Sequence, residues 1–175
     1  MRLSVDSYLE VVAATNLKQR TRKMLEYYHA EALHYAVAGT ANRLEYDLGF
    51  FVKNGDGAAD LKPIAHLYKT QVYALGEHLN VPASIRTRVP TSDTYPLAQS
   101  QEEFFFGMPL HMMDLVLHGC NEGIPPQEVA DAAGMTEEEV RRCYRRIEAI
   151  RRTTRFLHSP PLLCSEPSAN VRPAS

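Results

Sequence analysis

Apolar residues recur at helical spacing in the first part of the chain. Between residues 16 and 34 they alternate with lysines, arginines and glutamates, which predicts a helix with Asn16 as its N-cap. The apolar positions of this helix are Leu17, Met24, Tyr28 and Leu33. The next stretch, 35–40, is short and apolar and predicts a buried strand that ends beside Gly39. A helix followed by such a strand is typical of an open parallel sheet, whose ligands lie beyond the carboxyl ends of its strands.

The middle of the chain predicts helices that are separated by proline and glycine. Helices are expected over residues 66–79 and 101–119, with a helical turn over 81–88 that Pro82 opens. Pro109 should kink or split the longer helix, because proline cannot donate a backbone hydrogen bond. The predicted loops cover residues 50–63 and 89–100, and an irregular tail is expected after Pro160.

A helix pair is predicted near the end of the sequence. It consists of a helix, a turn at Gly134 and a second helix over 137–156. Thr136 should cap the second helix, with Glu139 completing a capping box. One strand among so many helices cannot form a stable sheet by itself, so we expect the chain to supply part of a larger sheet domain.

Composition and charge narrow the function classes. The chain has 175 residues, 45% of them hydrophobic and 23% charged, with a formal net charge of −2, which fits one globular domain. This balance gives no general attraction to nucleic acids or to anionic membranes. No apolar run is long enough to cross a bilayer, and the amino terminus lacks a secretory signal pattern. The three cysteines have neither metal-site nor disulfide spacing, so we expect a cytoplasmic protein with reduced thiols.

Residues 39–70 combine glycines, carboxylates and lysines just after the predicted strand, which suits a phosphorylated, magnesium-bound ligand. Glu45 closely follows Thr40 and could ligate Mg²⁺, or it could be a solvated glutamate in the first turn of a helix. Lys53 and Asp60 flank a glycine-rich NGDG loop, which either approaches a ligand closely or forms a surface hairpin.

Further cationic and hydroxyl side chains could meet a phosphate. Lys69 could act as a point charge, although a helical lysine is usually just solvated. Thr91 could donate its hydroxyl, or it could be an ordinary loop threonine. Arg20 and Arg22 lie on different faces of the predicted helix, so only one of them easily reaches a common site.

The arginine-rich helix over 137–156 allows a second function. With the preceding helix and the Gly134 turn it resembles a helix-turn-helix, whose basic face could contact nucleic-acid phosphates or an acidic partner protein. A solvated terminal helix explains the same pattern, and the negative net charge disfavours nucleic acid as a partner. The histidines do not cluster at metal spacing, and no serine or cysteine nucleophile motif is present in the sequence.

Taken together, these motifs resemble the NAD synthetase family of ATP-dependent ligases. The resemblance is carried by NLKQRTRKM (16–24), VAGTANRLEYDLGFFVKNGDGAADLKPIAHLYKTQVYALGEHL (37–79) and VPTSDTY (89–95). It extends over residues 8–163 and leaves 164–175 as an irregular tail. The resemblance implies an α/β, Rossmann-like adenine nucleotide alpha-hydrolase fold, of which this chain would hold a partial, predominantly helical C-terminal half.

The resemblance also implies a reaction and roles for particular residues. Enzymes of this family adenylate the carboxylate of deamido-NAD with ATP, release pyrophosphate, and then let ammonia displace AMP. By this resemblance Glu45 is a magnesium ligand. The ATP-binding residues would be Thr40, Lys69 and Thr91, and the deamido-NAD residues would be Arg20, Lys53, Asp60 and, as the nearest candidate for a C-terminal His-Lys pair, His158. Members of the family are homodimers, which makes a second copy an expected partner.

One defining motif of the family is absent from the sequence. The pyrophosphate loop of the form Ser-Gly-Gly-x-Asp-Ser occurs nowhere in it, and the family carries this loop upstream of the segment that matches here. We therefore expect the chain to be a fragment or one half of a split enzyme, inactive alone and dependent on a complementing N-terminal half. The sequence contains no glutaminase domain, so ammonia would be free or supplied by another chain.

Overall fold

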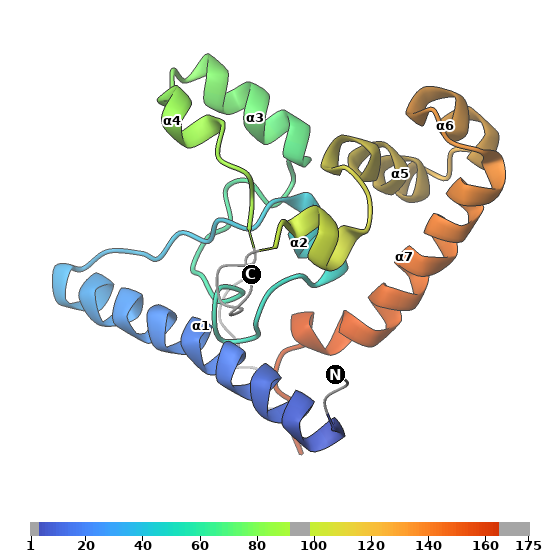
Figure 1. Ribbon diagram of the computed structural model, residues 1–175. Coiled ribbons are helices and arrows are strands. Elements are labelled where there is room, and N and C mark those ends of the chain that lie inside the picture. Colours follow the sequence, from blue (N-terminus) through green and yellow to red (C-terminus); the bar gives the residue numbers. More distant parts are fainter. Residues whose placement is uncertain (1–3, 92–98, 165–175) are drawn as a thin grey trace.

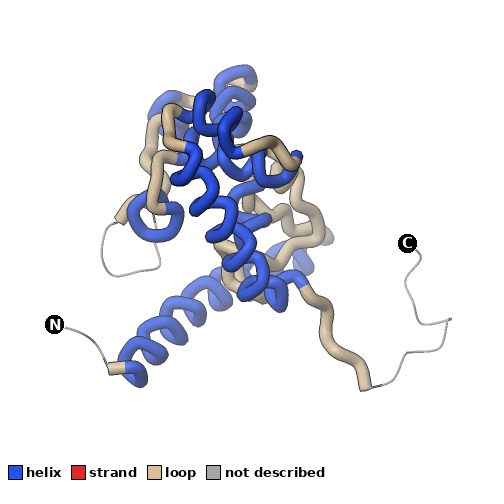
Figure 2. The backbone as a smooth tube through the Cα atoms, turned by 90° about the vertical axis from the view of Figure 1, so that its right-hand side faces the viewer, coloured by secondary structure: helices blue, strands red, loops and turns tan. Residues whose placement is uncertain are grey.

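The computed structural model describes residues 4–91 and 99–164, which are predominantly helical, as expected (Figures 1 and 2). None of the described helices combines the length and the apolar composition that crossing a membrane requires. The helices are α1 (Val5–Leu33), α2 (Arg43–Leu48), α3 (Lys69–His78), α4 (Ala83–Arg86), the π-helical turn η1 (Glu102–Phe106), α5 (Leu110–Glu122), α6 (Pro126–Ala133) and α7 (Glu137–His158).

The strand predicted over 35–40 is wrong in extent. The structure instead has one short parallel pairing, in which the Gly39 N–H donates to the Leu61 carbonyl at 2.8 Å and the Asp60 N–H donates to the Val37 carbonyl at 2.9 Å. Strands become stable when several of them pair side by side. Within the described residues this segment pairs along one edge only, so a regular strand does not form.

The first helix is longer than the sequence pattern predicts. α1 begins at Val5 after Ser4, whose hydroxyl accepts the Ser7 N–H at 3.1 Å. Asn16 therefore lies inside the helix and is not its N-cap, because no glycine or proline before it ends the helical run. The helix ends at Leu33, and its C-cap His34 adopts a left-handed conformation with φ 55°.

The apolar stripe of α1 is largely exposed to solvent. Leu17, Met24 and Tyr28 are 63%, 71% and 67% exposed, whereas Thr15 and Lys23 are buried. An amphipathic helix of a globular protein normally buries its apolar stripe. α1 runs along one edge of the molecule, away from α5 and α6 (Figure 1). Its outward stripe is an apolar surface of the kind that marks an interaction site.

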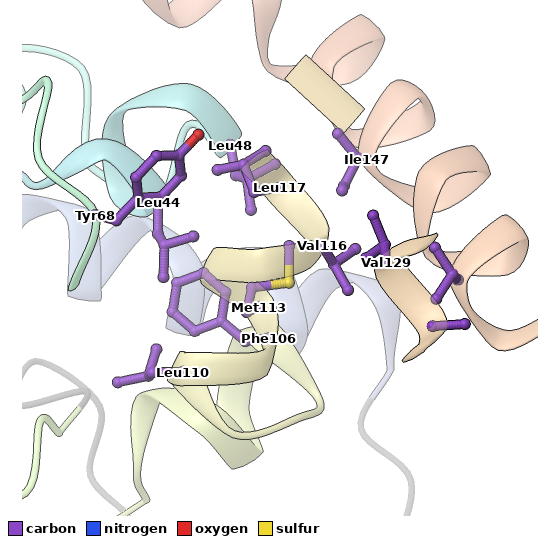
Figure 3. Packing of buried hydrophobic residues seen from close by; sticks show 12 residues of the cluster. Leu44, Leu48, Tyr68, Phe106, Leu110, Met113, Val116, Leu117, Val129 and Ile147 are labelled. Carbon is purple, nitrogen blue, oxygen red and sulfur yellow. The ribbon is translucent and has the colours of Figure 1, made fainter. Parts of the chain in front are cut away.

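The hydrophobic core forms where α2 and η1 meet the carboxyl-terminal helices (Figure 3). α5 is its centre, because it packs against α2, α3, η1, α6 and α7. The core residues labelled in Figure 3 are Leu44, Leu48, Tyr68, Phe106, Leu110, Met113, Val116, Leu117, Val129 and Ile147. This packing fixes α2 and the start of α3 relative to α5.

Local signals in the second half of the chain predict its elements well. Pro109 separates η1 from α5, which confirms the expected split. Thr136 caps α7, since its hydroxyl accepts the Glu139 N–H at 3.3 Å and the Glu139 carboxylate accepts the Thr136 N–H at 2.8 Å. The backbone and hydroxyl hydrogen bonds from Thr136 lower the pKa of Glu139. The helix predicted from residue 66 begins later, at Lys69.

Arg151 of α7 connects three helices. Its Nε donates to the Asp47 carboxylate of α2 at 2.8 Å, and its guanidinium also contacts Asn121 of α5 and Glu148 of α7. The Asn121 amide donates to the other Asp47 oxygen at 3.1 Å. The side chains of Arg151 and Asp47 are only 27% and 20% exposed. This network holds α2 against α5 and α7.

We predict that Arg151→Met lowers the free energy of unfolding by about 2 kcal/mol, because it leaves a half-buried carboxylate without its cation. Arg141→Met is the matched control, since Arg141 pairs with Glu137 one turn away on the exposed surface of α7. Loss of this control pair should lower the free energy of unfolding by about 0.5 kcal/mol. Urea unfolding of both variants measures the difference, and equal losses would contradict a structural role for the Arg151 network.

Candidate functional site

A cavity of about 510 Å³ lies between α1, α2, the loop after α2, the start of α3 and η1. Four of the residues predicted to bind ATP or magnesium line it. They are Thr40 before α2, Glu45 within α2, Lys69 at the start of α3, and Thr91. Residues from distant parts of the sequence therefore meet at one space, which we call the first cavity.

The Glu45 carboxylate is held in place at the wall of the first cavity. One of its oxygens accepts the Asn42 backbone N–H at 2.9 Å, and the Asn42 side chain accepts the Glu45 N–H at 3.2 Å. These bonds form a capping box at the start of α2. The other Glu45 oxygen accepts the Gln101 side-chain amide at 3.3 Å. Leu44 and Leu48 anchor the opposite side of α2 in the core.

Gln101 leaves an unsatisfied acceptor beside this carboxylate. Because an ionised carboxylate only accepts hydrogen bonds, Gln101 must turn its amide nitrogen toward Glu45. Its Oε1 then lies buried without a hydrogen-bond partner among the described residues. A buried acceptor of this kind costs free energy until a donor reaches it, which is typical of a functional site.

Lys69 owes its position to a buried carboxylate of α5. Asp114 is 4% exposed, and its two oxygens accept the backbone N–H groups of Lys69 at 3.1 Å and Thr70 at 2.7 Å. These bonds satisfy the first turn of α3, where Tyr68 supplies no side-chain cap of its own. The Lys69 ammonium lies 5.7 Å from the centre of the Tyr73 ring. A lysine on the first turn of a helix adds positive charge where the helix dipole already favours anions.

Tyr73 carries a hydroxyl that stays protonated. Burial raises the pKa of Tyr73, and the carboxylates of Glu102 and Glu45 raise it further. A protonated phenol is a hydrogen-bond donor, so Tyr73 adds a donor near Lys69.

The first cavity offers a limited set of metal ligands. Across the described ranges, no three or more His, Cys, Asp or Glu side chains gather as a metal site. Mg²⁺ is usually held by one or two carboxylates together with phosphates and waters. Glu45 fits such a role, and Asp56 is the other carboxylate that lines the cavity.

The residues predicted to bind deamido-NAD do not line the first cavity. The Lys53 ammonium donates to the carbonyls of Phe156 and Ser159, both at 2.8 Å, at the end of α7. Arg20 donates its Nε to the Lys53 carbonyl at 3.2 Å. The two cations therefore form a chain of contacts from α1 to the end of α7.

Asp60 and His158 also lie outside this cavity. One Asp60 oxygen accepts the Val37 N–H at 2.7 Å, so the carboxylate supports the short parallel pairing. His158 packs edge-on against the rings of Tyr46 and Phe51, at 4.8 Å and 5.2 Å between centroids. Lys53 and Asp60 therefore do not line the first cavity together with the four residues above, because backbone groups elsewhere bind their charges.

A second groove, of about 590 Å³, lies on the other side of α2. Arg43, Lys62 and His158 line it, and the Lys62 ammonium lies 4.6 Å from the centre of the Tyr46 ring. Burial lowers the pKa of Lys62, although the carboxylate of Asp56 opposes this shift.

The arginines of α7 do not form one free basic face. Arg141 and Arg145 pair with the glutamates at the start of the helix. Arg146 donates to the carbonyls of η1, and Arg151 belongs to the network with Asp47. These contacts occupy guanidinium groups that a nucleic-acid interface would require, so the helix pair is better explained as part of the fold.

Sequence reasoning missed several residues that shape the site. The Asn42–Glu45 capping box follows a spacing that the sequence displays, so it could have been found. Asp114 and Gln101 act on residues far from them in the chain, and no local pattern marks such contacts.

Known proteins with similar sequences cover about the same segment of the chain. The family model described as NAD synthase matches residues 3–161. The chain is 61% identical over 166 residues to a protein of Mesorhizobium japonicum and 59% identical over 162 residues to one of Rhizobium rhizogenes, both named NH(3)-dependent NAD(+) synthetase. These matches cover 95% and 93% of the chain but 52% and 49% of the relatives, so the chain spans about half the length of the curated relatives it matches.

The fold is also similar to that of a solved structure. The NMN synthetase from Francisella tularensis superposes with a TM-score of 0.65 at 26% sequence identity, over 87% of this chain and 56% of that one. The sequence match and the similarity of the fold agree, and the chain belongs to the NAD synthase family.

Proposed function

We propose that the chain is the carboxyl-terminal part of an NAD synthase, which amidates deamido-NAD to NAD with ATP and ammonia. Residues 8–163 form the domain in this proposal, and the protein is cytoplasmic. The observation that carries it is the meeting of Thr40, Glu45, Lys69 and Thr91 at the first cavity, in a chain that belongs to this family. Hydroxyls, a lysine and a carboxylate are the groups that a magnesium-bound triphosphate requires.

The reaction has two steps. A carboxylate oxygen of deamido-NAD attacks the α-phosphorus of ATP, and pyrophosphate leaves. Ammonia then attacks the acyl carbon, AMP leaves with the oxygen, and the nitrogen loses a proton. Lys69 places its ammonium against the phosphates where negative charge gathers in the first step, while Thr40 and Thr91 donate hydroxyl hydrogens to phosphate or ribose oxygens.

Magnesium fits the carboxylate end of the first cavity. When bound, Mg²⁺ supplies Lewis-acid stabilisation of the phosphates. Glu45 would hold it, because the Asn42 and Gln101 contacts already fix the orientation of this carboxylate. The buried Oε1 of Gln101 has no donor among the described residues, and a hydroxyl of a bound nucleotide would supply one, which supports a ligand at this position.

Of the proposed deamido-NAD residues, Lys53 directly follows the lining of the first cavity. Phe51 and Val52 line it, and Lys53 follows them directly in the chain. In this proposal Arg20, Lys53, Asp60 and His158 hold the dinucleotide beside the bound ATP. Lys53 would exchange its contacts with the carbonyls of α7 for contacts with the substrate, so binding of deamido-NAD should loosen the end of α7.

Two surfaces of the chain suit macromolecular partners. Among the described residues, the segment 37–39 has β pairing along one edge only. Its other edge suits further strands of a Rossmann-like adenine nucleotide alpha-hydrolase sheet, which a complementing half would supply. The outward stripe of Leu17, Met24 and Tyr28 on α1 suits a second copy of the chain in a homodimer.

The first prediction concerns ATP. Lys69→Met should weaken binding of magnesium ATP by about tenfold, because it removes a charge-assisted contact with a phosphate. Lys18→Met is the control, since it removes the same charge from an exposed position of α1 outside the first cavity. Calorimetric titration measures the affinity of both variants for magnesium ATP. Equal affinities of the two variants would contradict the assignment of Lys69 as a phosphate ligand.

The second prediction concerns activity. The chain alone should not convert deamido-NAD, and mixing it with the segment of the Mesorhizobium japonicum relative that it does not match should restore ATP-dependent NAD formation. Glu45→Gln should remove the restored activity, because it weakens the only proposed metal contact of the chain. NAD formed per minute is the measurement. Turnover by the chain alone, or restored activity that Glu45→Gln leaves unchanged, would contradict the proposal.

The third prediction concerns the homodimer. Replacing Met24 and Tyr28 with glutamine should weaken self-association at least about tenfold, because it removes apolar area from the α1 stripe. Leu162→Gln is the control, since Leu162 is 98% exposed and lies far from α1 in the chain. Sedimentation velocity at several concentrations measures association. A monomeric wild-type chain would reject the second copy as the partner of this stripe.

A further inference from the structure

We propose that Arg146 of α7 is a positioning residue for the first cavity. Its guanidinium binds two backbone carbonyls of η1, and through this turn it holds the Gln101 amide against the Glu45 carboxylate. The inference rests on the function proposed above, in which Glu45 holds magnesium. Arg146 itself lies outside the lining of the first cavity, so its effect on the site is indirect.

The carbonyls at the end of η1 lack the partners that a continuous α-helix would give them. In such a helix each carbonyl accepts the N–H of the residue four positions later. For Phe105 that residue is Pro109, which has no N–H. For Phe106 it is Leu110, whose N–H donates instead to the Glu102 carboxylate at 2.7 Å. The two carbonyls therefore need donors from outside the turn.

Arg146 provides both donors from one guanidinium. Its Nη1 donates to the Phe106 carbonyl at 2.6 Å, and its Nη2 donates to the Phe105 carbonyl at 2.5 Å. Several donors in one rigid plane are a property of arginine that lysine lacks. Gly107 permits this close approach, because a Cβ added there would lie 3.2 Å from Nη1 and because its φ of 73° is left-handed.

The part of α7 that carries Arg146 is fixed in the fold. The next residue, Ile147, is 1% exposed and belongs to the hydrophobic core. One turn further on, Arg151 binds Asp47 of α2. The hydrogen bonds of Arg146 therefore attach η1 to a helix that core packing and a half-buried ion pair already hold in place.

The turn η1 carries part of the wall of the first cavity. Gln101 comes directly before η1 and lines the cavity together with Phe104 and Phe105 of the turn. The Gln101 amide reaches Glu45 at 3.3 Å, which is long for a hydrogen bond, so a small shift of η1 would break it. π-helical turns such as η1 are rare and frequently lie at functional sites. Arg146 thus acts on Glu45 through η1 and Gln101.

Nuclear magnetic resonance of the ligand-free 175-residue chain tests the positioning itself. Arg146→Met should shift the side-chain amide signal of Gln101, because the amide moves away from the Glu45 carboxylate. Arg146→Lys keeps the positive charge but loses the paired donors, and it should cause the same shift. Arg145→Met is the matched control. It removes the neighbouring cation, which pairs with Glu138 on the exposed surface, and should leave the Gln101 signal in place.

Calorimetric titration with magnesium ATP tests the consequence for the site. Arg146→Met should weaken binding by about fivefold, because a displaced amide no longer orients Glu45. Gln101→Met should weaken binding at least as much. Adding Arg146→Met to Gln101→Met should then change the affinity by less than about twofold, since both replacements remove the same contact. A general loss of stability would not produce this dependence on Gln101.

Three results would overturn the role of Arg146. An unchanged Gln101 amide signal in both Arg146 variants would show that η1 does not depend on the guanidinium. Equal effects of Arg146→Met and Arg145→Met on ATP affinity would reveal only a general effect of charge. Full additivity of Arg146→Met and Gln101→Met would mean that Arg146 does not act through Gln101.

The proposed function is decided separately from this role. A chain that does not bind magnesium ATP would reject the proposed function, and the ligand-free spectra would still show whether Arg146 holds the Gln101 amide in place. A chain that binds magnesium ATP and forms NAD with its complement keeps that function even if the Arg146 variants leave the Gln101 signal unchanged.

Discussion

The carboxylate of Asp114 is the contact on which the arrangement of the site depends. It is buried in α5 and accepts the N–H groups of Lys69 and Thr70, so the first turn of α3 cannot shift without leaving a buried charge unsatisfied. α2 packs on the same helix α5 and carries Glu45. One helix therefore sets the separation between the lysine and the carboxylate that face the first cavity, although neither functional side chain belongs to it.

The helix α7 also holds α2 and Lys53 in place. Its Arg151 binds Asp47 of α2, and carbonyls at its end bind the Lys53 ammonium. α7 thus stabilises α2 and binds a lysine that we propose as a contact of the substrate. If Lys53 contacts a substrate as proposed, substrate binding and the attachment of α7 would compete for this lysine, which would couple the end of α7 to occupation of the site.

Local chemistry made some of this structure predictable from the sequence. Pro109 and the capping box of Thr136 act on their immediate neighbours. The starts of the helices that follow them were therefore predicted correctly. The resemblance to a family, and no single motif, singled out four residues that line the first cavity, and their roles remain a proposal. The position of Lys53 depends on carbonyls more than a hundred residues away, and the extent of the strand after α1 depends on neighbouring strands, so local patterns could not predict either.

The central claim is that distant residues surround one nucleotide, and nuclear magnetic resonance with a paramagnetic ligand tests it most directly. Mn²⁺ prefers the same oxygen ligands as Mg²⁺, so manganese ATP can replace magnesium ATP as the probe. Bound to the ¹⁵N-labelled chain, it should broaden the amide signals of Thr40, Glu45, Lys69 and Thr91 together, and leave that of the exposed Arg142 on α7 sharp. Broadening at only one of these four positions, or spread over unrelated surfaces, would contradict the account.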